Sequence, residues 1–125
     1  MISPMILLHK VPPVSALLKA TAKSGGTASF QKLHALFNKG EADKNVYDTL
    51  EKAALELADF GTAIYSVVLA KRDGLPGSGF FSLYRIHRND EFQLIAGSSI
   101  EQVLSPVQMT EMVMLERKRV YAHAG

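Results

Sequence analysis

A glycine-rich segment near the middle of the chain is the strongest candidate for chemistry. Residues 74–79 read Gly-Leu-Pro-Gly-Ser-Gly, which requires a tight backbone path whose exposed amides could surround a phosphate. A nucleotide-binding P-loop would continue with Lys and then Ser or Thr, but Phe80 and Phe81 follow here. A nucleophile elbow around Ser78 would need glycines where Pro76 and Phe80 stand. We therefore interpret the segment as a shaped turn that contacts a partner.

The other reactive side chains do not form a catalytic or metal-binding pattern. Cysteine is absent, which excludes thiol nucleophiles, disulfides and thiolate metal sites and favours a reducing compartment. The histidines lie far apart, with no second ligand at metal-binding spacing: His9, His34, His87 and His123. No pair of carboxylates stands out for acid–base catalysis. The sequence thus predicts a protein that is not an enzyme and that holds no metal and no cofactor.

The chain of 125 residues has a net charge of only +2, but its charges are unevenly distributed. The first acidic residue is Glu41, and the lysines before it are Lys10, Lys19, Lys23, Lys32 and Lys39. These lysines are either solvated on helix surfaces or form a basic face for a polyanion. The apolar start of the chain is too short for a signal peptide or a membrane span. We expect a single cytoplasmic domain over residues 1–125 that does not contact a membrane.

Three helices are predicted in the first half of the chain. Pro12 and Pro13 are suited to begin the first helix, and glycines at positions 25 and 26 end it. Thr27 or Ser29 can cap the second helix, whose apolar face contains Phe30, Leu33, Leu36 and Phe37. Asp43 can cap the third helix, whose apolar stripe contains Val46, Leu50, Ala53, Ala54 and Leu57.

From Thr62 onward the pattern becomes typical of strands. Residues 63–69 are rich in β-branched and aromatic side chains. Residues 80–88, after the glycine-rich segment, alternate in their later half, and residues 91–96 alternate after the turn pair Asn89-Asp90. The sequence therefore predicts a three-stranded antiparallel meander with residues 74–79 at the tip of its first hairpin. A short helix at residues 80–84 is the alternative for the second strand.

A last helix is predicted to begin at Ser105, with Pro106 at its first position and Gln108 completing a capping box, and to reach about Ala122. Its middle is apolar on more than one side and rich in methionine, which suits adaptable contact surfaces. Either the helix is buried on both sides, or it forms a homodimer interface through Met109, Met112, Val113 and Leu115. Residues 116–119, Glu-Arg-Lys-Arg, are expected to be a solvated and mainly basic helix end.

These elements define an α+β fold with three N-terminal helices, a three-stranded antiparallel meander and a C-terminal helix. Their order over residues 12–96 resembles a winged-helix domain, in which the hairpin is the wing. The resemblance implies that Lys71, Arg72, Arg85 and Arg88 lie along the phosphates of double-stranded DNA, and Lys32, His34 and Lys44 are further candidates for nucleic-acid binding. The run from Val67 to Phe81 also resembles a stretch of small uncharacterised bacterial proteins, which implies no function.

The third helix does not suit DNA reading. Residues 43–59 contain five carboxylates and two lysines, whereas recognition helices usually present basic or amide side chains. The leading hypothesis is a non-enzymatic nucleic-acid-binding protein that uses the basic hairpin and the basic N-terminal part. The alternative is a protein-interaction or accessory module of the phage or mobile-element type, with the acidic third helix and the Met-rich last helix as partner surfaces. A small enzyme that uses the glycine-rich segment would lack a nucleophile and a base.

Overall fold

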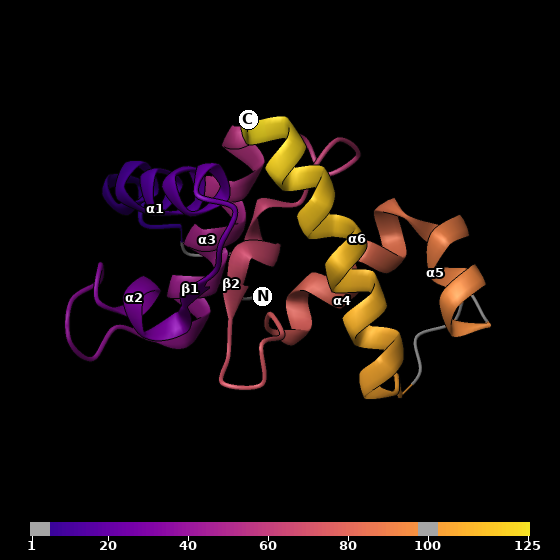
Figure 1. The fold of residues 1–125 in the computed structure, drawn as a ribbon. Helices are drawn as coiled ribbons and strands as arrows, with labels where there is room; N and C mark the ends of the chain where they lie inside the picture. The colour runs from indigo at the N-terminus through magenta and orange to yellow at the C-terminus, as the bar shows by residue number, and fades with distance from the viewer. Residues whose placement is uncertain (1–5, 98–102) are drawn as a thin grey trace.

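The computed structural model describes residues 6–97 and 103–125, which are mostly helical (Figure 1). The N-terminal part contains η1 (Leu8–Lys10), α1 (Val11–Lys23), α2 (Phe30–His34) and α3 (Asp43–Leu57). The C-terminal part contains η2 (Tyr65–Val68), α4 (Ser78–His87), α5 (Asn89–Ala96) and α6 (Pro106–Ala124), where η denotes a 3-10 helix. Two short strands, β1 (Ala28–Ser29) and β2 (Leu69–Ala70), form a parallel pair in which Ala28 lies opposite Leu69.

Local signals in the sequence account for the ends of the helices in the N-terminal part. Proline occupies the first turn of α1, and Gly25 just beyond its end has a φ of 70°, which glycine adopts without strain. Ser29 caps α2 by accepting a hydrogen bond from the amide of Lys32, although α2 ends at His34, earlier than its apolar pattern predicts. The first residue of α3 is Asp43, and its N-cap is Ala42.

The predicted antiparallel meander is wrong for the described residues, and with it the α+β fold class. The sheet has two strands and is parallel. Residues 65–68 form η2, and residues 91–96 lie in α5. Residues 80–84, for which a helix was the alternative, lie in α4, which extends to His87. The glycine-rich segment joins β2 to α4 rather than two strands, so the hairpin that would be the wing is missing from this part of the chain.

Burial explains why residues 63–69 do not behave as a strand. Nearly all of them lie in the core, and η2 contacts α1, α3 and α6. A continuous apolar run does not reveal its period, so it fits a buried helical turn as well as a buried strand. In α5, the expected turn pair Asn89-Asp90 instead forms the first helical turn, where acidic side chains are favourable. Gly97, with a φ of 79°, ends that helix.

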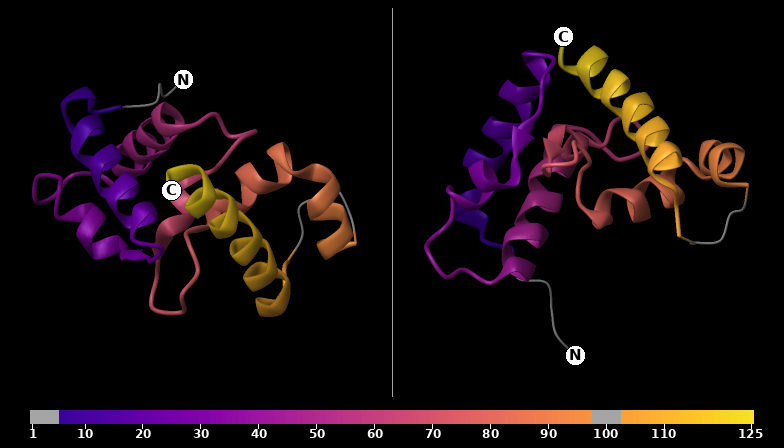
Figure 2. Two further views of the ribbon diagram at one scale, coloured as in Figure 1. Left: turned by 45° about the horizontal axis from the view of Figure 1, so that its top comes forward. Right: turned by 60° about the horizontal axis from the view of Figure 1, so that its bottom comes forward.

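Three helices, α1, α3 and α6, pack against η2, and Figure 2 shows how they are arranged. Helices α1 and α3 pack against each other on one side of η2. Helix α6 crosses the other side, and the C-terminal end of α6 approaches α1. Helices α4 and α5 follow one another with a sharp change of direction and form an arm beside α6. In the described segments, no helix combines the length and the apolar character needed to cross a lipid bilayer.

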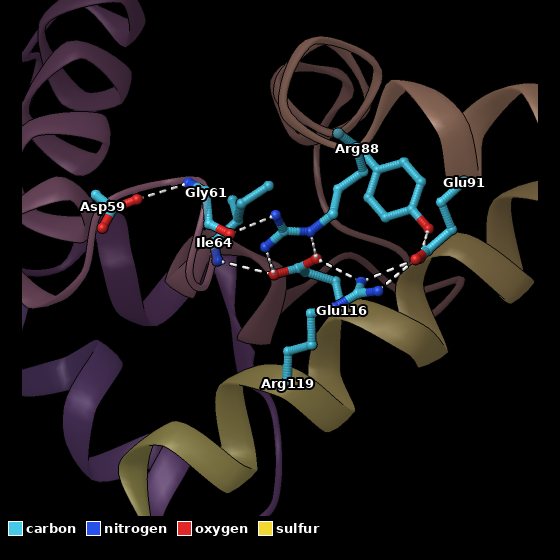
Figure 3. A network of polar contacts seen from close by, with 8 residues as sticks. Asp59, Gly61, Ile64, Arg88, Glu91, Glu116 and Arg119 are labelled. Carbon is cyan, nitrogen blue, oxygen red and sulfur yellow. Dashed lines mark hydrogen bonds and ion pairs between the residues drawn. The ribbon is translucent and has the colours of Figure 1, made fainter.

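A buried carboxylate connects these parts. Glu116 of α6 has no exposed surface, and it accepts hydrogen bonds from the amide of Ile64 (2.9 Å), Arg88 Nε (3.0 Å) and Arg119 Nη1 (3.1 Å) (Figure 3). Arg88 Nη1 in turn donates to the carbonyl oxygen of Gly61 at 2.7 Å. Glu116 therefore ties α6 both to the segment that precedes η2 and to the junction of α4 and α5.

A second carboxylate extends the network to α5. Glu91 accepts hydrogen bonds from Arg119 and from the hydroxyl of Tyr84 (Figure 3). The Arg119 guanidinium is the main reason that the pKa of Glu91 lies below its usual value. Burial and the neighbouring Glu91 raise the pKa of Tyr84, so its hydroxyl stays protonated and donates. The network thus alternates acids and bases, and charge compensates charge throughout.

Replacing Glu116 with alanine leaves the Arg88 guanidinium buried without its carboxylate. We expect the free energy of unfolding to fall by about 3–5 kcal/mol, because an unpaired buried charge is costly. The control Glu56→Ala changes an exposed glutamate of α3 and should cost less than about 0.5 kcal/mol. Urea unfolding followed by circular dichroism measures both. A loss below about 1 kcal/mol for Glu116→Ala would contradict the role given to the network.

Because the pKa of Glu91 is lowered in the folded chain, the contribution of Glu91 to the free energy of unfolding depends on pH. A carboxyl whose pKa is lower in the folded state stabilises fully above its ordinary pKa of 4.5, and this stabilisation is lost as the pH falls through the folded-state value. We therefore expect Glu91→Gln to lower the free energy of unfolding at neutral pH. The difference from the natural chain should shrink steadily below pH 4.5, as urea unfolding across the acid range would show. A difference that stays constant with pH would exclude this role.

Candidate functional site

A pocket of about 480 Å³ lies between α2, α3 and the start of α4. Its apolar lining consists of Phe30, Tyr47, Leu50, Pro76, Phe80 and Leu83. Its polar side chains are Glu51, Ser66, Lys71 and Ser78, and the glycines at positions 77 and 79 complete the lining. Mostly apolar concavities of this size with a few polar groups are the usual form of a binding site. The glycine-rich segment singled out in the sequence therefore forms one wall of the candidate site.

Aromatic side chains from α2 and α3 form the opposite wall. The ring of Tyr47 packs edge-on against Phe30 and His34, with centroids 6.3 and 5.8 Å away. The Tyr47 hydroxyl lies 3.4 Å from His34 Nε2. Burial, with a smaller effect of Asp43, raises the pKa of Tyr47, so this wall carries a neutral phenol. The cluster supplies a large and rigid apolar contact surface.

Backbone hydrogen bonds within the segment that leads into α4 hold it in a tight turn. The Lys71 amide donates to the Leu75 carbonyl oxygen, and the Gly74 amide donates to the Lys71 carbonyl oxygen, each at 2.9 Å. Gly74 has a φ of 85°, which a side chain would disfavour. Gly77 is the N-cap of α4, and a Cβ atom there would lie 3.5 Å from Phe30 Cζ. This close approach brings the two walls together.

The side chain of Arg117, in α6, donates hydrogen bonds to the segment that leads into α4. Arg117 donates from Nε to the carbonyl oxygen of Val67 (2.8 Å) and from Nη2 to that of Gly74 (2.9 Å). A longer contact of 3.4 Å joins Nη2 to the carbonyl oxygen of Leu69. Burial lowers the pKa of Arg117, but a guanidinium stays charged in proteins. Arg117 therefore holds the pocket wall against α6.

The expectation of a solvated end at residues 116–119 is wrong for three of its four side chains. Glu116 is fully buried, and Arg117 and Arg119 are half-buried, so that Lys118 alone among the four is exposed. A signal for Glu116 was present, because it lies four residues from Met112 and from Val120, and both are buried. A polar residue on a buried helical face indicates a buried polar contact. The sequence prediction did not use this signal and placed Glu116 in solvent.

The residues predicted to bind nucleic acid differ in their surroundings. The guanidinium of Arg88 is held in a pair with the buried Glu116, which counts against its predicted role at a phosphate. Lys44 pairs with Asp48 at 2.7 Å and Lys71 with Asp73 at 3.7 Å, so carboxylates offset both charges. His34 packs against Tyr47, and Arg85 is half-buried on α4. Lys32 and Arg72 are exposed.

Half of the predicted homodimer interface belongs to the core of the chain itself. Met112 and Val113 are buried against the rest of the molecule, which counts against their role in contacting a second copy. Met109 is half-buried, and Leu115 is at the margin of exposure. The most exposed apolar residues of α6 are Val107 and Met114, which were not among the four predicted interface residues.

Neither the geometry nor the comparisons indicate a metal site or a family. Within residues 6–97 and 103–125, no three His, Asp or Glu side chains come together as metal ligands would. No known family, no curated protein and no solved structure matches the chain. Any function of the chain therefore rests on its own sites, of which the pocket is the most developed one described above.

Replacing Arg117 with glutamine should loosen the pocket wall. The shorter amide cannot reach the carbonyl oxygens of Val67 and Gly74 together, and lost charge-assisted hydrogen bonds cost about 1.5–3 kcal/mol each. We expect faster amide hydrogen exchange across residues 67–75 and a lower free energy of unfolding. Arg72→Gln, a change at an exposed arginine of the same segment, is the matched control. Unchanged exchange in Arg117→Gln would show that the segment does not depend on α6.

Proposed function

We propose that the chain is a non-enzymatic protein-interaction module that binds a peptide segment of a partner protein in the pocket between α2, α3 and α4. The pocket itself carries this proposal. Its volume of about 480 Å³ lies within the range of roughly 300–1,000 Å³ that ligand pockets occupy, and it exceeds the volume of one side chain. Two adjacent apolar side chains of a peptide are a suitable occupant, because an anchor buried against aromatic walls dominates most interfaces.

The charges of the pocket favour a peptide over a nucleic acid. Glu51 and Lys71 both line it, so it offers one negative and one positive group. A peptide can match both groups with one basic and one acidic residue beside its apolar anchors. A phosphate backbone would be attracted by Lys71 and repelled by Glu51, and the pairing of Lys71 with Asp73 weakens that attraction.

The lining also favours binding over catalysis. Ser66 and Ser78 are its hydroxyl groups, and histidine is not among the residues that line it. A serine nucleophile needs an adjacent general base, and the neighbouring His34 instead contacts Tyr47. The available groups can therefore fix the orientation of an occupant, which is what a recognition site requires.

Tyr47→Ala should weaken peptide binding by at least about tenfold, because it removes an aromatic wall against which the anchor side chains of the peptide would pack. The control Leu55→Ala removes a side chain of α3 that is equally exposed (45% against 42%) but does not line the pocket, and binding should stay unchanged. The probe is a pool of capped hexapeptides in which two central Phe or Leu residues lie between one Lys and one Glu. Amide shifts of the labelled chain near residues 47, 66 and 77–80 report binding.

A second variant blocks the pocket without removing a contact. A Cβ atom at Gly79 meets no atom within 4 Å, so the backbone has room for a side chain there, and Gly79→Leu should fill part of the pocket and abolish the shifts. Circular dichroism checks that this variant is folded. The absence of saturable shifts with the natural chain would overturn the proposal. Binding of random duplex DNA at low salt that is lost in Lys71→Ala and Arg72→Ala would support the nucleic-acid hypothesis in its place.

A further inference from the structure

The exposed face of α6 carries an apolar strip that the pocket does not use. Val107 and Met114 are 77% and 66% exposed, and Leu115 lies beside them. A shallow groove runs along this strip, lined by Pro106, Val107, Thr110, Glu111, Met114 and Leu115. It shares no residue with the lining of the first pocket. Helix α6, which carries the strip, crosses the face of the molecule seen in Figure 1.

The spacing along this strip is that of a helix-pairing seam. Residues 107, 111, 114 and 118 follow one another at intervals of four, three and four, the alternation that keeps one stripe of a helix against a second helix. Each of these side chains is exposed. Glu111 and Lys118 occupy the two charged positions of the seam, and neither forms an ion pair with any other described residue.

We propose that this strip pairs with the same strip of a second copy of the chain, with the two α6 helices antiparallel about a two-fold axis between Met114 and Leu115. Glu111 and Lys118 lie at equal distances on either side of that axis. Glu111 of each copy is therefore level with the partner's Lys118, and the symmetry forms two opposite-charge contacts. Val107 is level with the partner's Ala122, whose small side chain is also exposed and leaves room for it.

Charge selects the antiparallel orientation. In a parallel pair, Glu111 would lie against the same glutamate of its partner and Lys118 against the same lysine, so both contacts would be repulsive. The antiparallel pair turns both into attraction while it covers Val107 and Met114. A second copy of this chain therefore supplies both the apolar surface and the charges that the strip requires.

The experiment measures the oligomeric state of the full chain by sedimentation equilibrium from micromolar to hundreds of micromolar. Glu111→Lys and Lys118→Glu should each raise the dimer Kd at least about tenfold, because every single reversal creates two like-charge contacts. The double variant E111K/K118E exchanges the charges and should restore the dimer. Glu56→Lys, a reversal on α3 outside the strip, should leave the Kd unchanged.

A change to the apolar part of the strip gives an independent readout. Met114→Glu should disrupt the dimer, whereas Leu55→Glu, at an exposed leucine of α3, should not. Circular dichroism confirms that each variant is folded. A natural chain that is monomeric over the whole range, or a double variant that does not regain the affinity lost in the single variants, would overturn the proposal.

Discussion

The buried carboxylate of Glu116 is the contact on which the arrangement of the molecule depends. A charge removed from water is tolerated only where donors replace its hydration, and here a backbone amide and two guanidinium groups do so. These donors come from three different places: the segment before η2, the junction between α4 and α5, and α6 itself. Their convergence on one carboxylate gives the C-terminal helices a defined position that apolar packing alone would leave less specific.

The pocket depends on the same helix through the next residue. Glu116 and Arg117 are consecutive, so their side chains leave α6 in different directions. One meets Arg88 and Ile64, and the other meets the carbonyl oxygens of the segment that leads to the pocket wall. A single turn of α6 therefore positions both the α4–α5 arm and the glycine-rich segment, while its opposite face remains open to solvent.

Sequence reasoning succeeded where the signal was local and failed where the structure depends on distant partners. Ser105, Pro106 and Gln108 form the capping box that their order indicates. The alternation after Phe80 is compatible with either period, and in the structure these residues form α4, which packs against α5, a contact that no local pattern shows. For the site, the glycine-rich segment could be identified, but its aromatic wall could not. Phe30 and Tyr47 join that wall only because α2 and α3 fold back onto it.

The pocket lies where the two parts of the chain meet, and this gives its occupant a second effect. One wall comes from α2 and α3, and the other from the segment between η2 and α4. Besides the core, the four-residue sheet of β1 and β2 joins the same two parts. A molecule that contacts both walls acts as a crosslink between them, so its binding free energy adds to the resistance of the whole fold to unfolding. Occupancy would therefore be readable as thermal stability, and the empty protein would be the more easily opened form.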